Sequence, residues 1–448
     1  MTARRLLLLC IWFGVAGLTA LALAAAVAGS SVQTFIETAG VNIPTEDVIA
    51  DYMWGLAWGC ILLAAIFVWP VSWTHKKLLA AGWLIKCFVA LVVMLPYEER
   101  YYGLDCWYYF QRAHMAWAEI VPFLLRGSSD LVIGIGALHL RVGPDSYHAM
   151  KLSFAWIGLV AAYLFYRAAE RLLDKHSPFV FWTLILYPSI LFWSSILGKD
   201  SIVLVAIGLH VWGLANLAVR RRPVYVIAVV CGILAVSAIR IWMGPILIVP
   251  CLLVIILRIE HAGWRVASVV LVGLALLGLA PATVDRLSLD KAETLVDATR
   301  AVTSNWAANS SLDHDLELNS SWDLVLFVPR GIFDAYVRPL PGDVDNLFGW
   351  LAGFENLGLL LVALWAVLRL RLRYLRDPMF FWGAALLLTW GMAYGIVAHK
   401  DLGTAVRFKL QVLPVLLGVI GYLLRRPSRQ FAFHAERKLA LARVASLR

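Results

Sequence analysis

Carboxylates, aromatic side chains and an arginine gather in residues 97–110, directly after an apolar run that ends at Pro96. Within this stretch, Asp105 precedes residues 106–125, which carry aromatic and apolar side chains at helical spacing but are too polar to cross a bilayer. Such a helix would lie in the membrane interface. Asp105 therefore has two interpretations: a helix N-cap, or a general base at the depth where a lipid headgroup meets an acceptor.

Glu98 and Glu99 lie in the same stretch and are possible acidic helpers of Asp105. They can share the role of general base or bind a divalent cation, because carboxylate oxygens are suitable ligands for Mg²⁺ and Ca²⁺. They are equally consistent with solvated charges at the point where the chain leaves the bilayer. The sequence contains no zinc-type spacing and no disulfide framework, so no cofactor is required and the metal dependence stays open.

Basic residues recur at the ends of apolar runs on what we expect to be one side of the membrane. Several cations at one depth suggest an anionic ligand, because arginine binds phosphate as a fork and lysine binds it as a point charge. Snorkelling lysines and paired boundary arginines are the structural alternatives. The candidate lipid-phosphate-binding residues are Lys199, Arg240, Arg330, Arg407 and Lys409.

Lys86 interrupts the middle of an apolar run, where a charged side chain is costly to bury. A buried ion pair with Glu355 or another acid is the structural interpretation. A substrate site near the bilayer midplane, as in transporters, is the functional one.

Composition defines the class of chain that carries these residues. Of its 448 residues, 61% are hydrophobic and 15% are charged, whereas a typical soluble domain is about 25% charged. Apolar runs near the ~20 residues needed to cross a bilayer recur, without the alternation of barrel strands. We therefore predict an all-α, polytopic helical membrane protein with about twelve transmembrane helices. The expected spans are 6–29, 52–72, 78–96, 150–168, 178–196, 201–218, 223–239, 242–257, 264–284, 347–368, 378–398 and 408–424.

The segments between these spans alternate in charge. Lys76-Lys77, Arg220-Arg221-Arg222 and the tail after Arg425 fall on one side, and the long polar segments fall on the other. The positive-inside rule then places both termini in the cytoplasm and Asp105 outside. The net charge of +10 reflects this topology, with contacts to anionic membrane lipids, and requires no nucleic acid. We expect a multi-pass protein of the bacterial inner (cytoplasmic) membrane with a periplasmic or extracellular active site.

Several stretches resemble the GT-C superfamily of membrane glycosyltransferases, which use polyprenyl-phosphate-linked sugars on the outward face. Residues 105–113, Asp-Cys-Trp-Tyr-Tyr-Phe-Gln-Arg-Ala, are similar to the acidic first outward loop and its interfacial helix. Residues 150–173 are similar to the span that follows. Residues 188–195 with Lys199-Asp200 are similar to a block common in such proteins, and residues 406–410 with Pro414 fit the same group.

The chain also departs from the superfamily pattern. Two spans precede the one that leads into the matching helix, so they would be an N-terminal addition. Asp105 stands with Glu98 and Glu99 rather than in a tight acidic pair. The expected organisation is a two-helix addition (1–77), a GT-C-like catalytic core (78–284), an outward loop with interfacial helices (285–346), C-terminal transmembrane helices (347–424) and a basic cytoplasmic tail (425–448).

The resemblance implies an inverting glycosyltransferase that moves a sugar from a polyprenyl-phosphate donor to a lipid or glycan acceptor. Asp105 would be the general base, and Lys199, Arg240 and Arg407 would stabilise the leaving phosphate. An O-antigen or exopolysaccharide polymerase or ligase, which uses diphosphate-linked oligosaccharides, is the alternative within enzymes. A transporter or lipid flippase is the alternative from another class.

Overall fold

The computed structural model describes residues 45–100, 105–220, 222–258 and 320–425, with a few isolated positions elsewhere. All regular structure in these ranges is helical, in agreement with the predicted fold class. Six helical stretches are long and apolar enough to cross a membrane, and a bent pair, α20 and α21, makes a possible seventh. The six are α3 (Val48–Val68), α4 with its continuation (Trp73–Glu98), α9 (Tyr147–Leu173), α12 (Lys199–Arg220), α18 (Leu347–Val367) and α19 (Pro378–Lys400).

Four of the twelve expected spans are broken or shorter than a full span, and one of them, 408–424, is bent by 64° between residues 409 and 413. Residues 178–196 form α10 (Pro178–Leu186) and α11 (Pro188–Trp193), because Pro188 cannot donate a helical hydrogen bond. Helices α13 (Val224–Ile239) and α14 (Met243–Arg258) have 16 residues each, fewer than the ~20 of a full span. The expected spans 6–29 and 264–284 lie outside the described ranges.

The expected interfacial helix over residues 106–125 is two helices in the structure, α6 (Asp105–Arg112) and α7 (Trp117–Arg126). The link between them is held by residues further along the chain: Arg141 Nη2 donates to the Met115 carbonyl oxygen at 2.7 Å. Gly127 then reverses the chain with φ +73°, and a side chain there would collide with the Ala238 carbonyl oxygen. Helix α8 (Ser128–Val142) follows.

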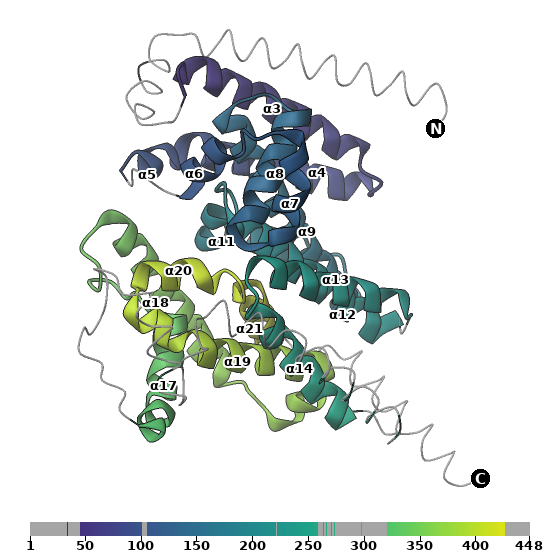
Figure 1. The fold of residues 1–448 in the computed structure, drawn as a ribbon. Coiled ribbons are helices and arrows are strands. Elements are labelled where there is room, and N and C mark those ends of the chain that lie inside the picture. The colour runs from purple at the N-terminus through teal and green to yellow at the C-terminus, as the bar shows by residue number, and fades with distance from the viewer. Residues whose placement is uncertain are drawn as a thin grey trace.

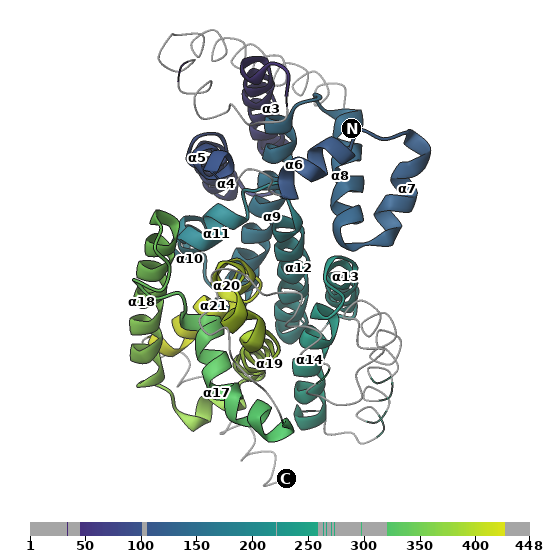
Figure 2. The ribbon, with the colours of Figure 1, turned by 60° about the vertical axis from the view of Figure 1, so that its left-hand side comes forward.

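Helix α9 is the central element of the N-terminal half, and α3, α4, α10 and α12 pack around it. In the C-terminal half, α17 (Ser321–Val337), α20 (Leu402–Lys409) and α21 (Leu413–Leu424) pack on α19. Figures 1 and 2 show the two halves one above the other. Contacts of α14 with α19 and of α11 with α20 join the halves. The α11–α20 contact matters for function, because it brings the start of α12 close to α20.

Lys86 stabilises the break between α11 and α12. Its Nζ donates to the Ser194 carbonyl oxygen (3.0 Å), to Ser194 Oγ (2.7 Å) and to Ser195 Oγ (3.0 Å), so all three of its protons have acceptors. The expected ion pair with Glu355 is not formed. Glu355 instead accepts from the backbone N–H of Ser189 at 3.1 Å.

Candidate functional site

Four predicted site residues come together from four segments of the chain. Asp105 begins α6, Lys199 begins α12, Arg240 follows α13, and Arg407 lies in the last turn of α20. Asp200, next to Lys199, lies between the two arginines. We call Asp105, Lys199, Asp200, Arg240 and Arg407 the ionic cluster.

Asp200 is the centre of this cluster. Its carboxylate is 3% exposed and accepts from Arg407 Nε at 2.5 Å and from Arg240 Nη2 at 3.4 Å. A carboxylate buried this deeply requires ionic partners, and one carboxylate cannot neutralise two guanidinium groups. Arg240 is also nearly buried, its guanidinium lies 3.8 Å from the Phe408 ring centroid, and its Nη1 has no hydrogen-bond partner. The arginine pair is therefore fixed in place and carries positive charge that Asp200 does not neutralise.

Asp105 differs from Asp200 because its side chain is 66% exposed. Its Oδ2 lies 4.0 Å from Arg407 Nη1, which is ionic contact without a close hydrogen bond. Arg407 itself is 25% exposed. An exposed carboxylate beside a partly exposed guanidinium leaves both groups accessible to a ligand.

Lys199, Tyr109 and Ser128 complete the surroundings of the cluster. Lys199 Nζ lies 3.4 Å from Ser128 Oγ and interacts electrostatically with the other four members. Burial, followed by the nearby Asp105 charge, raises the pKa of Tyr109 to about 12, so its phenol stays protonated. Gly198 has no side chain to separate Arg407 from Tyr109, since a Cβ there would lie 3.6 Å from Arg407 Nη2 and 4.0 Å from Tyr109 Cε2.

The cluster contains three cations and two carboxylates, so it carries a net charge of +1, or +2 without Asp105. A phosphate monoester or diester is an anion of matching charge. The guanidinium of Arg407 also lies 5.7 Å from the ring centroid of Trp193. Further rings continue from Trp193: Tyr97 lies 5.9 Å from it, and Phe348 on α18 lies 4.9 Å from Tyr97. Aromatic surface therefore runs from a membrane helix to the arginine.

The other predicted residues lie elsewhere. Glu98 is fully buried and forms an ion pair with Lys151 at 2.7 Å, which explains its presence without a catalytic role. Glu99 follows it in α5 (Leu95–Arg100). The side chain of Arg330 is exposed on α17, and no described contact links it to the ionic cluster. Lys409 is fully buried and donates to Asn356 Oδ1 and, at 3.3 Å, to the Tyr336 carbonyl oxygen.

Asp200, Tyr109 and Ser128 are not among the site residues predicted from the sequence. The signal for Asp200 was present: Arg240 has almost no loop around it, and a boundary arginine normally requires an acidic partner. Nothing in the sequence marks Tyr109 among its aromatic neighbours. In the described ranges one group of side chains has the proximity of metal ligands, namely His75, Glu170 and His176, and it does not include Asp105.

The described helices define the class of protein: a helical, multi-pass membrane protein. Comparison of the chain with protein-family models, with curated proteins and with solved structures gives no match.

Proposed function

We propose that the protein is a glycosyltransferase that moves a sugar from a polyprenyl-phosphate donor to a lipid or glycan acceptor. The observation that carries the proposal is the pairing of an exposed carboxylate, Asp105, with a fixed arginine pair, Arg240 and Arg407, held by the buried Asp200. A general base and a phosphate-binding group are the two components that this reaction needs side by side. These four residues come from four separate segments of the chain, so they are not close together merely because they are neighbours in sequence.

In this proposal Asp105 accepts the proton of an acceptor hydroxyl. The hydroxyl oxygen forms a bond to the anomeric carbon while the bond from that carbon to the phosphate oxygen breaks, with inversion of configuration. The electron pair leaves with the lipid phosphate, which gains one negative charge. Arg407, Arg240 and Lys199 stabilise this charge, and they require little reorganisation because Asp200 already fixes the arginines.

The surroundings of the cluster suit a donor that arrives from the membrane. The rings of Phe348, Tyr97 and Trp193 offer apolar contact along a path from α18 to Arg407. Helix α7 exposes Trp117, Val121 and Leu125, the side chains expected of a helix in contact with membrane lipids. We place the site on the periplasmic or extracellular face of a bacterial cytoplasmic membrane, with both termini cytoplasmic. No nucleic acid or metal is needed for the step.

One observation favours a second candidate, a polymerase or ligase of O-antigen or exopolysaccharide that uses a diphosphate-linked donor. The arginines are fixed by Asp200 and are less exposed than Asp105, with side-chain exposures of 6% for Arg240 and 25% for Arg407 against 66% for Asp105. If the arginines alone carried the chemistry, Asp105 would be dispensable and the lipid product would be a diphosphate. A transporter receives less support, because Lys86, the residue expected at the midplane, is fully occupied with Ser194 and Ser195.

The proposal is tested by replacing the general base. Asp105→Asn keeps the size of the side chain but cannot accept the proton, so we expect sugar transfer to fall about 10²–10⁴-fold. Transfer is measured in proteoliposomes with radiolabelled hexose and pentose linked to farnesyl monophosphate and with extracted membrane glycolipids as acceptors.

Asp145→Asn is the matched control, because Asp145 is also 66% exposed and paired with one basic side chain, His114. This variant should keep full activity. Full transfer by Asp105→Asn would refute the assignment of the base and favour the second candidate.

A further inference from the structure

A second polar cluster lies at the end of α9, apart from the ionic cluster. It combines His75 in the first turn of α4, Glu170 near the end of α9, and His176 in the link between α9 and α10. Tyr147 begins α9, 23 residues before Glu170, which corresponds to about 35 Å along the helix. The turn that leads to Lys199 meets α9 at Gly158, which is 12 residues, or about 18 Å of helix, before Glu170, so the second cluster is distinct from the ionic cluster.

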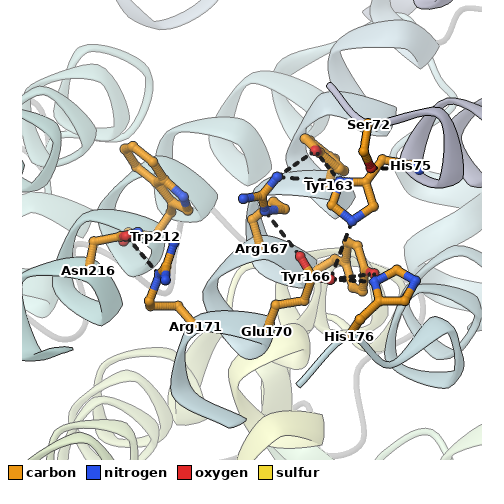
Figure 3. Close-up of polar contacts among 10 residues, drawn as sticks. All are labelled: Ser72, His75, Tyr163, Tyr166, Arg167, Glu170, Arg171, His176, Trp212 and Asn216. Carbon is orange, nitrogen blue, oxygen red and sulfur yellow. Dashed lines mark hydrogen bonds and ion pairs between the residues drawn. The ribbon is translucent and has the colours of Figure 1, made fainter. Parts of the chain in front are cut away.

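The side chains of His75, His176 and Tyr166 all approach one oxygen atom of Glu170, Oε1. Glu170 Oε1 lies 2.6 Å from His176 Nδ1 and 3.3 Å from His75 Nε2. Tyr166 Oη lies 2.7 Å from the same oxygen and 2.7 Å from His176 Nδ1. Figure 3 shows these groups facing one another, while Arg171 points away toward Asn216. The arrangement presents two imidazole nitrogens, a carboxylate oxygen and a phenol oxygen to one small volume.

From this arrangement we propose that His75, Glu170 and His176 bind a divalent transition-metal ion of the Zn²⁺ type. Imidazole with carboxylate is a ligand set typical of zinc, with metal–ligand distances of about 2.0–2.2 Å. Four ligands at that distance are about 3.3–3.6 Å apart in a tetrahedron. The ligand atoms of the three residues all lie within 4.8 Å of one another, so small side-chain adjustments suffice. Tyr166 or a water molecule supplies the fourth position.

Hydrogen bonds behind the ligands support this assignment. His75 Nδ1 lies 3.0 Å from Tyr163 Oη, which leaves His75 Nε2 directed at the site. Arg167 Nη1 donates to Tyr163 Oη at 3.0 Å, and Arg167 Nε lies 3.1 Å from Glu170 Oε2. His75 Nδ1 and Glu170 Oε2 are thus held by neighbouring side chains, while His75 Nε2 and Glu170 Oε1 face one another. Hydrogen bonds of this kind orient metal ligands.

The competing explanation is an ion-pair cluster without a metal. Arg167 already neutralises part of the charge of Glu170, and a protonated histidine would complete the pairing. The same Arg167 charge weakens the attraction for a dication, so we expect a site of moderate affinity. In either case the cluster joins α4 to the end of α9, but only the metal site binds Zn²⁺ in a fixed ratio.

The test measures zinc bound to the full-length, untagged protein purified in detergent. The protein is first treated with a chelator, then equilibrated with ZnCl₂, desalted and analysed by elemental mass spectrometry. We expect about one ion per chain for the unaltered protein, and loss of that ion in His75→Ala and His176→Ala. Zn²⁺ should also raise the midpoint of thermal unfolding of the unaltered protein but not of His176→Ala.

His114→Ala is the matched control, because His114 also contacts a carboxylate, Asp145 at 2.8 Å, without further ligands. It should bind as much zinc as the unaltered protein. If His75→Ala does not fold, His176→Ala still decides the question, since His176 is on an exposed linking segment. Less than half an ion per chain, or a ratio that His176→Ala leaves unchanged, would overturn the proposal.

Discussion

Asp200 shows how a single residue can organise a site. It accepts from two arginines while only 3% exposed, so its charge replaces the water that would otherwise solvate both guanidinium groups. Removing one partner from a buried ion pair leaves the other charge unpaired, which typically costs about 3–5 kcal/mol. In the proposed reaction Asp200 is therefore a positioning residue, which acts through Arg240 and Arg407.

Replacement of Asp200 should separate its positioning role from catalysis. We expect Asp200→Asn to lower the free energy of unfolding by about 3–5 kcal/mol and to raise KM for a farnesyl-phosphate-linked sugar more than it lowers kcat. Asp200→Glu, which keeps the charge, should restore part of the affinity. Unfolding in detergent and steady-state transfer kinetics measure these effects. A variant with unchanged KM and stability would show that Asp200 does not hold the arginines.

At the scale of elements, the turn between α11 and α12 decides where Lys199 and Asp200 lie. Lys86 binds this turn from one side, and α9 approaches it from another at Gly158. A Cβ at Gly158 would lie only 2.1 Å from the Ser194 carbonyl oxygen, so the backbone must move if any side chain is added. The lysine that suggested a transport site from sequence thus supports the geometry of another site.

We predict that Gly158→Ala displaces this turn, lowers stability by about 1–3 kcal/mol and reduces sugar transfer, because Lys199 follows directly. Gly358 on α18 provides the control, since no atom lies within 4 Å of the position of its Cβ. Gly358→Ala should be neutral or slightly stabilising. Thermal unfolding and transfer assays on both variants test this. Equal behaviour of the two alanine variants would contradict the role given to Gly158.

At the scale of the whole molecule, topology determines which face carries the chemistry. Helix α9 has 27 residues and a length of about 40 Å, which is long enough for its two ends to lie on opposite sides of a bilayer. The start of α6 lies at the first end, where Tyr147 Oη donates to Cys106 Sγ at 3.2 Å, and the basic residues Arg167, Arg171 and Lys175 are near the other. From the positive-inside rule we propose that the second end faces the cytoplasm.

Cysteine labelling of intact cells tests this topology. In a cysteine-free background, Ala118→Cys on α7 and Lys175→Cys after α9 both place a thiol at an exposed position. A membrane-impermeant maleimide should label the first before lysis and the second only after lysis. Labelling in the reverse order would place the ionic cluster in the cytoplasm and exclude an outward-facing reaction.

Sequence predicted the helical membrane class well, because hydropathy alone decides which segments enter a bilayer. The expected spans 223–239 and 242–257 match α13 and α14 to within one residue, whereas the expected spans 178–196 and 408–424 are interrupted, the first of them at Pro188. Sequence also named four members of the ionic cluster but grouped Lys409 with them. Lys409 is two residues from Arg407 and points to Asn356, so side-chain direction, which depends on tertiary contacts, separated two neighbouring cations.

The proposed function requires the ionic cluster to bind a lipid-linked phosphate, and equilibrium binding of radiolabelled farnesyl monophosphate in nanodiscs measures this step by itself. A charge-assisted hydrogen bond is worth about 1.5–3 kcal/mol, so Arg407→Gln should weaken binding about 10- to 150-fold. Arg112→Gln, which removes an exposed arginine from the end of α6, should bind normally. Unchanged affinity in Arg407→Gln, or equal binding of uncharged farnesol, would contradict the account.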